Sequence, residues 1–221
     1  MSQEVRECTK TFSAGAALVQ NRLVVLSSGV LQYADAYTTA IGTLEDTTFA
    51  SGDVVAVRLL PGEGTFKMMA SAAITSGAYV YQTASGKIDD VGFIPVGIAL
   101  EAASADGDII EVLPSRMIPD NVASVAAAGS AQGDAAAVTA GINTVSAADG
   151  TKGVILPGAK AGLVVQVYNE HATNGLKVYP ATGDDINDGT TNAAITMEGK
   201  GIARFTGLDT TTWAASYVVN A

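Results

Sequence analysis

The stretch GDVVAVRLLPGEGTFKMMASAAITSGAYVYQ, residues 52–82, gives the clearest indication of the fold class of this chain. Short runs rich in Val, Leu, Met and Tyr alternate in it with turns such as Pro61-Gly62-Glu63-Gly64 and Ser76-Gly77. Glycine adopts positive φ at low cost and aspartate bonds to nearby backbone, so such turns separate strands. No part of the N-terminal half keeps a helical apolar period over three turns, which argues against helices.

The same pattern continues in both directions along the chain. In the N-terminal half, further predicted strands are Leu23–Leu26, Pro95–Leu100 and Asp108–Leu113. In the C-terminal half, the predicted strands are Gly153–Leu156, Leu163–Tyr168, Leu176–Tyr179, Ala194–Met197, Ile202–Phe205 and Trp213–Val219. Strands this closely spaced favour an all-β fold built as antiparallel barrels or sandwiches, without βαβ units.

A segment of different composition separates the two strand-rich parts. The run VASVAAAGSAQGDAAA is rich in small residues, and its two glycines interrupt any helix that the alanines favour. We therefore predict an Ala/Gly-rich linker with one short helix after Pro119-Asp120. The predicted organisation is an extended N-terminal arm over 1–15, a β domain over 16–114, the linker over 115–137 and a β-sandwich-like domain over 138–221.

Composition excludes several classes of function. Acidic residues outnumber basic ones by 22 to 12, and no Lys/Arg cluster is present, so nucleic-acid binding is not expected. The polar start MSQEVRECTKTF does not resemble a signal peptide, and no apolar run is long enough to span a membrane. With one cysteine, Cys8, no disulfide can form within the chain.

Candidate catalytic and metal-binding residues are few. His171 is the one histidine and lies in a predicted loop beside Glu170, where a solvated histidine is favoured over a catalytic one. TGDDINDG, residues 182–189, invites a calcium interpretation, but Ile186 and Ile195 occupy positions that an EF-hand fills with oxygen ligands. Asp89 and Asp90 are a pair of carboxylates of the kind that glycosidases use, but nothing in the sequence sets the distance between them that this chemistry requires. We expect no enzyme activity, no metal and no cofactor.

Aromatic and methionine residues are expected mainly in cores. Met68 and Met69 alternate faces on a predicted strand, while Tyr79 and Tyr81 share a face, the expected core side, with Val80 opposite. Trp213 and Tyr217 share one face of the last strand and are candidates for core packing or for a contact between subunits.

The first domain resembles the small capsid decoration, or cement, proteins of tailed bacteriophages. The resemblance covers roughly residues 15–114. It rests on Gly64–Phe66, on Ala73–Tyr81, on the strand Gly97–Glu101 and on the Gly-Asp turn that leads into Gly107–Pro114. A second likeness, over residues 150–219, is to a β-rich module appended to various phage virion proteins. It rests on VQVYNEHATNGLKVYPATGDDIN and on the terminal Thr-Trp strand.

The resemblance implies a structural protein made in the host cytoplasm and located on the outer surface of the virion capsid. Its partners would be the major capsid protein and copies of itself, as a homotrimer at threefold or quasi-threefold positions, where it bridges capsid subunits and stabilises the head. We expect the arm, with Val5, Arg6, Lys10 and Phe12, to reach the shell by strand addition.

An adhesive or glycan-binding fibre protein is the alternative. In that interpretation Tyr168, Tyr179 and Trp213 would stack on sugars.

Overall fold

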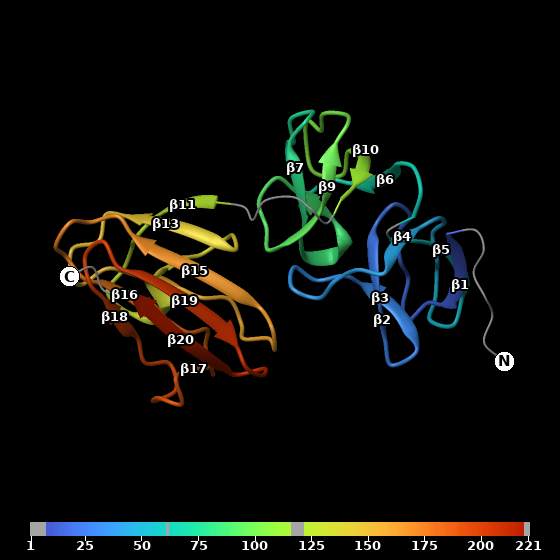
Figure 1. Cartoon of the computed structure of the whole chain (residues 1–221). Helices are drawn as coiled ribbons and strands as arrows, with labels where there is room; N and C mark the ends of the chain where they lie inside the picture. Colours follow the sequence, from blue (N-terminus) through green and yellow to red (C-terminus); the bar gives the residue numbers. More distant parts are fainter. Residues whose placement is uncertain (1–7, 61, 116–121, 219–221) are drawn as a thin grey trace. The chain divides into compact units, whose positions relative to one another are not determined.

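The computed structural model describes residues 8–60, 62–115 and 122–218. Contacts within the chain divide it into two compact units, Met1–Pro119 and Asp120–Ala221. Apart from two single-turn 3-10 helices, η1 (Ala84–Gly86) and η2 (Gln132–Asp134), all regular structure described is β (Figure 1). The predicted all-β fold class is confirmed. No described helix is long and apolar enough to cross a membrane.

The first sheet of unit 1 is antiparallel and has the order β1-β5-β4-β2-β3. Its strands are β1 (Thr9–Ser13), β2 (Leu23–Ser27), β3 (Val30–Tyr33), β4 (Gly42–Leu44) and β5 (Val54–Leu59). The sheet curls until its two edge strands meet just beyond β1, where the Gly15 N–H donates to the Leu31 carbonyl at 2.8 Å. Ala14, Leu18, Val24, Leu31, Leu44, Val55 and Val57 fill its interior.

The second sheet of unit 1 has the order β6-β10-β9-β7-β8 and is also antiparallel. Its strands are β6 (Phe66–Met69), β7 (Tyr79–Gln82), β8 (Ile88–Asp89), β9 (Ile94–Ala99) and β10 (Ile109–Pro114). Met68 is buried and Met69 half-buried, so the predicted alternation holds. Leu23, Ala34 and Ala40 join the core of this sheet, which ties the two sheets of the unit together.

Strand β7 differs from the prediction. Val80 is buried with Tyr81, whereas Tyr79 is exposed, although the sequence predicted the two tyrosines on the core side with Val80 opposite. The cause is a register shift between Val80 and Tyr81 in the pairing with β9. Such an irregularity breaks the period of two, so neighbouring residues can face the same side.

Unit 2 contains a six-stranded sheet, β11-β13-β15-β19-β20-β17, and a four-stranded sheet, β12-β14-β16-β18. The strands of the larger sheet are β11 (Val122–Ala126), β13 (Ile142–Ser146), β15 (Val164–Asn169), β17 (Asp185–Ile186), β19 (Ile202–Gly207) and β20 (Thr212–Val218). Those of the smaller sheet are β12 (Ala136–Ala137), β14 (Gly153–Ile155), β16 (Leu176–Tyr179) and β18 (Ile195–Met197).

The pairing in unit 2 is mixed, which corrects the expectation of an antiparallel second domain. From β11 to β16 the chain visits the two sheets alternately. Successive strands of one sheet therefore run in the same direction, and β11, β13 and β15 pair in parallel, as do β12, β14 and β16. Strands β18, β19 and β20 then return antiparallel (Figure 1).

The segment predicted as a linker also differs. Residues 122–126 form β11, and 132–137 contain η2 and β12, so most of the Ala-rich run belongs to unit 2. Val125 and Ala127 are buried there and belong to its core. No helix begins at residues 122–126, and residues 116–121 lie outside the part of the chain that is described.

Candidate functional site

The candidate catalytic histidine braces a turn. The His171 Nδ1 accepts the backbone N–H groups of Thr173 and Asn174, at 3.2 and 2.8 Å. The ring is half-buried after β15 and has Asn174 as its side-chain neighbour. This arrangement fixes the loop, because both ring nitrogens are engaged by residues of the same turn.

The acidic residues considered for metal binding or glycosidase chemistry also stabilise local structure. The Asp184 carboxylate is buried and accepts the Ala159 N–H at 2.8 Å, which pins the 182–189 turn to another loop. Asp89 accepts the N–H of Asp90, and burial together with this neighbour raises the pKa of Asp90. Across the described ranges, no three His, Cys, Asp or Glu side chains gather where they could hold a metal ion.

Several exposed turns are held by an ionised aspartate. The Asp149 carboxylate accepts the N–H groups of Lys152 and Thr151, both at 2.9 Å, and these bonds hold its pKa far below the usual range. The backbone of Thr211 and Thr212 lowers the pKa of Asp209 in the same way. A depressed carboxyl pKa means that the folded state binds fewer protons than the unfolded chain.

We predict that Asp149→Asn reduces the acid sensitivity of unit 2. The contribution of Asp149 to the free energy of unfolding is complete above its unfolded pKa, about 3.9, and is lost as pH falls through the lower folded pKa. The free energy of unfolding of the unaltered protein, from urea titrations between pH 6 and 2, should therefore fall more steeply than that of the variant. Equal slopes would contradict this role of Asp149.

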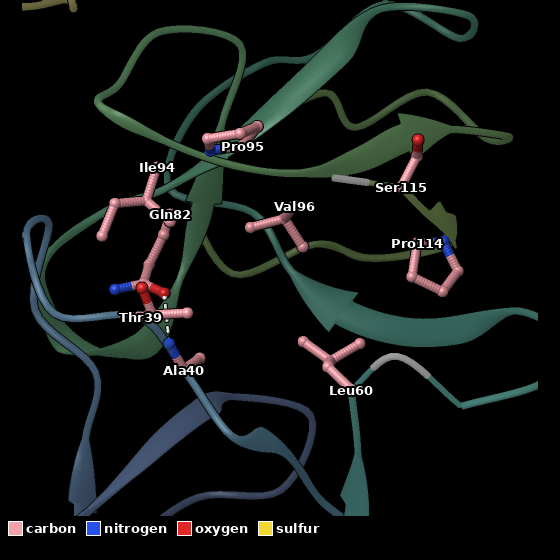
Figure 2. A pocket seen from close by; sticks show the side chains of 9 residues that line it. All are labelled: Thr39, Ala40, Leu60, Gln82, Ile94, Pro95, Val96, Pro114 and Ser115. Carbon is pink, nitrogen blue, oxygen red and sulfur yellow. Dashed lines mark hydrogen bonds between the residues drawn. The ribbon is translucent and has the colours of Figure 1, made fainter. Parts of the chain in front are cut away.

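A small cavity lies between the two sheets of unit 1 (Figure 2). It is lined by Thr39, Ala40, Leu60, Gln82, Ile94, Pro95, Val96, Pro114 and Ser115. Its volume of about 30 Å³ suits one water molecule and falls well short of a ligand pocket. The Gln82 side chain points to Ala40 and accepts its N–H at 3.1 Å (Figure 2). The cavity borders the core that joins the sheets, since Ala40, Gln82 and Val96 are buried while the rest of its lining is at least partly exposed.

Two of the four predicted capsid-contact residues lie in the described part of the chain. Lys10 and Phe12 belong to β1, whereas Val5 and Arg6 fall outside the described residues. Phe12 packs partly against the core of the first sheet, and the Lys10 ammonium lies 5.6 Å from its ring centroid. Residues 9–13 are therefore a strand of unit 1, where the sequence predicted part of an extended arm.

The outer edge of β1 is free over residues 9–13, where no described strand pairs with it, although the chain just beyond it meets β3 at Ala14 and Leu31. The Leu59 N–H donates to Cys8 O at 2.6 Å and the Ala14 N–H donates to Asp53 O at 2.8 Å, so the even-numbered residues direct their backbone groups toward β5. In an antiparallel pair the odd-numbered residues then direct theirs away from it. Hence the N–H groups of Thr9 and Thr11 point to an edge that no described strand covers.

An exposed tip, which sequence reasoning missed, lies at one end of the first sheet. We define the Phe49 tip as residues 16–20 and 45–54. Phe49 is 85% exposed and Val54 73% exposed, more than any other large apolar residue described. Gly52 closes the turn with φ 93°, a conformation that few other residues adopt. The available signal in the sequence was an aromatic residue within the turn-like run TTFASGD.

The aromatic candidates of unit 2 are mostly buried. Trp213 is 0% exposed and packs in the core of its own chain, which agrees with the core-packing role predicted for it and not with a contact between subunits or a sugar platform. Tyr179 is also buried, and its hydroxyl donates to Ser130 O at 2.9 Å. Tyr168 is half-buried with the Lys200 ammonium 5.8 Å from its ring centroid. The backbone of Tyr217 pairs with Ala203, and its side chain lies outside what the structure describes.

Comparisons with known proteins bear mainly on unit 1. The family model described as phage cement protein matches residues 2–114. A solved structure similar to part of the chain is the head fibre gp8.5 N base of bacteriophage phi29. It shares 21% identity at a TM-score of 0.41, and the match covers 49% of this chain and 93% of that chain. Among curated proteins, none matches the sequence.

Proposed function

Because the chain belongs to the phage cement protein family, we propose that it binds the outer surface of a phage head and bridges neighbouring major capsid protein subunits. The family match carries this proposal, since it covers more than half of the chain and nearly all of unit 1. As a family member the chain is a structural virion protein. Bridging adds binding free energy that must be lost before capsid subunits separate, so the shell becomes harder to disrupt.

We further propose that the protein acts as a homotrimer. A contact of standard size, roughly 800 Å² per partner, is weak or tight depending on its anchors. Three linked contacts raise the avidity by orders of magnitude without improving any one of them. A trimer on a threefold position of the shell gains this advantage through symmetry.

The contact is proposed to include the N-terminal segment with Val5 and Arg6, and β1 with Lys10 and Phe12. The free edge of β1 supports this choice, because an uncovered strand can add to a sheet of another protein. The outward N–H groups of Thr9 and Thr11 would then donate to the capsid protein. Phe12 would hold β1 in place and would not itself enter the capsid, since its ring already packs against the first sheet.

The test is a heat challenge of heads assembled without this protein. Adding the unaltered chain should raise the temperature at which the heads release their DNA, followed by dye fluorescence. Thr11→Pro should weaken head binding by about tenfold, because proline removes an N–H that points to the free edge while the bonds to β5 remain. Cosedimentation with heads measures the affinity.

Thr11→Ser serves as the matched control and should bind as the unaltered chain does. Removal of residues 2–7 tests the preceding segment separately and leaves β1 in place, whereas removal through residue 13 would also delete that strand. Heads that gain no heat resistance and bind no protein would contradict the proposed function.

A further inference from the structure

The Phe49 tip is the most exposed apolar feature of the described chain and has no part in the β1 contact proposed above. The backbone of Leu18 pairs with that of Thr48 in both directions, at 3.2 and 2.8 Å. Leu18 and Thr48 are buried, so their neighbours Ala17 and Phe49 face outward together. Val54, which begins β5 directly after the turn, adds a second large apolar side chain.

The tip is held rigid from several sides. The Asp53 carboxylate accepts the N–H groups of Phe49 and Ala50, at 2.8 and 3.0 Å. The Thr48 hydroxyl donates to Ala16 O at 3.0 Å, and the Gln20 amide donates to Glu45 O at 2.7 Å. A backbone held in this way loses little conformational freedom on binding, which favours an efficient interface anchor.

The charges around the tip indicate what kind of surface it fits. Glu45 and Asp46 are exposed, and neither forms an ion pair with any residue that the structure describes. Two or more copies of the chain meeting at this tip would bring these carboxylates together, and like charges at an interface cost several kcal/mol. A partner with basic side chains around an apolar pocket would gain an apolar contact with Phe49 and ionic contacts with Glu45 and Asp46.

We propose that the Phe49 tip is a second anchor on the capsid shell, in which Phe49 enters an apolar pocket whose rim carries Lys or Arg. This inference rests on the proposed function, because it assumes that the shell is the partner. It adds a named contact that is distinct from the β1 edge. The acidic rim sets the orientation and speeds the encounter, while the phenyl ring supplies most of the affinity.

The test compares the affinity of Phe49→Ser with that of the unaltered chain for heads assembled without the protein. Loss of a central aromatic anchor should weaken binding by about 30-fold or more. Leu208→Ser, at an exposed apolar position of unit 2, is the matched control and should change the affinity less than about twofold. Charge reversal with Glu45→Lys and Asp46→Lys should weaken binding at low salt, and the difference should shrink at high salt.

Three results would overturn the inference. If Phe49→Ser binds heads as tightly as the unaltered chain, Phe49 is not an anchor. If the variant instead forms a smaller oligomer in light scattering, the tip is a contact between copies of this chain. If the unaltered chain binds no heads, the proposed function fails and this inference fails with it. Melting curves of Phe49→Ser should match those of the unaltered chain, because the ring is mostly exposed.

Discussion

Gln82→Leu is expected to lower the free energy of unfolding of unit 1 by about 3 kcal/mol. Gln82 is 1% exposed, and its amide connects β7 to the loop between β3 and β4. The Oε1 accepts the Ala40 N–H at 3.1 Å, while the Nε2 donates to Thr38 O at 2.7 Å and to Asp35 O. Leucine has a similar volume but can make none of these bonds, and the Ala40 N–H would then be buried without its acceptor.

Urea unfolding followed by far-ultraviolet circular dichroism measures this change, and the fluorescence of Trp213 in unit 2 separates the transition of unit 1 from that of unit 2. Gln32→Leu, at an exposed position of β3, is the matched control and should shift stability by less than about 0.5 kcal/mol. Equal stability of the two variants would show that the Gln82 amide does not hold the loop.

The strands themselves could be predicted from sequence, because a strand with one buried face alternates apolar and polar residues. Met68 and Lys67 face opposite sides of β6, as the alternation requires. The direction in which a strand pairs with its neighbour cannot be predicted from this alternation. An apolar alternation is the same in parallel and antiparallel strands, so the sequence of β13 or β15 does not reveal that the connecting segment crosses to the second sheet. The mixed pairing of unit 2 was missed for this reason.

Some residues were misread because one residue type serves two purposes. Alanine and glycine in 122–137 have the composition of a linker, yet residues of this segment form the strands β11 and β12. Asparagine usually indicates a turn, but Asn143 and Asn169 are fully buried within strands. The register shift in β7 exchanged the expected positions of Tyr79 and Val80, because an irregularity of pairing depends on both strands.

The candidate site was only partly predictable. The segment around Lys10 and Phe12 was chosen for its position before the first predicted strand, and the structure makes it an edge strand. The exposure of Phe49 depends on the loop at 16–20, which is distant in sequence and pairs with Thr48. The apolar period of a strand predicts which of its two faces is buried. It does not predict which loops come together to form a surface.

Asn143→Ala is expected to lower the free energy of unfolding of unit 2 by about 3 to 5 kcal/mol. Asn143 is 0% exposed at the start of β13. Its Oδ1 accepts the N–H groups of Thr139 and Ala140, at 3.2 and 3.3 Å, and its Nδ2 donates to Ala140 O at 2.7 Å and Gln166 O at 3.3 Å. The side chain thus closes the turn into β13 and joins that turn to β15. Alanine would leave a cavity and bury the Ala140 N–H without this acceptor.

Trp213 provides a selective measurement of this loss, because it is the one tryptophan of the chain and lies in the core of unit 2. The urea midpoint of tryptophan fluorescence should fall for Asn143→Ala, whereas Thr190→Ala, at an exposed turn of the same unit, should leave it within about 0.5 kcal/mol of the original stability. A small change in both variants would contradict this role of Asn143. The parallel pairing of β11, β13 and β15 would then be enough to maintain the turn. A large change in Asn143→Ala alone would show that this buried amide stabilises the turn into β13 and its contact with β15.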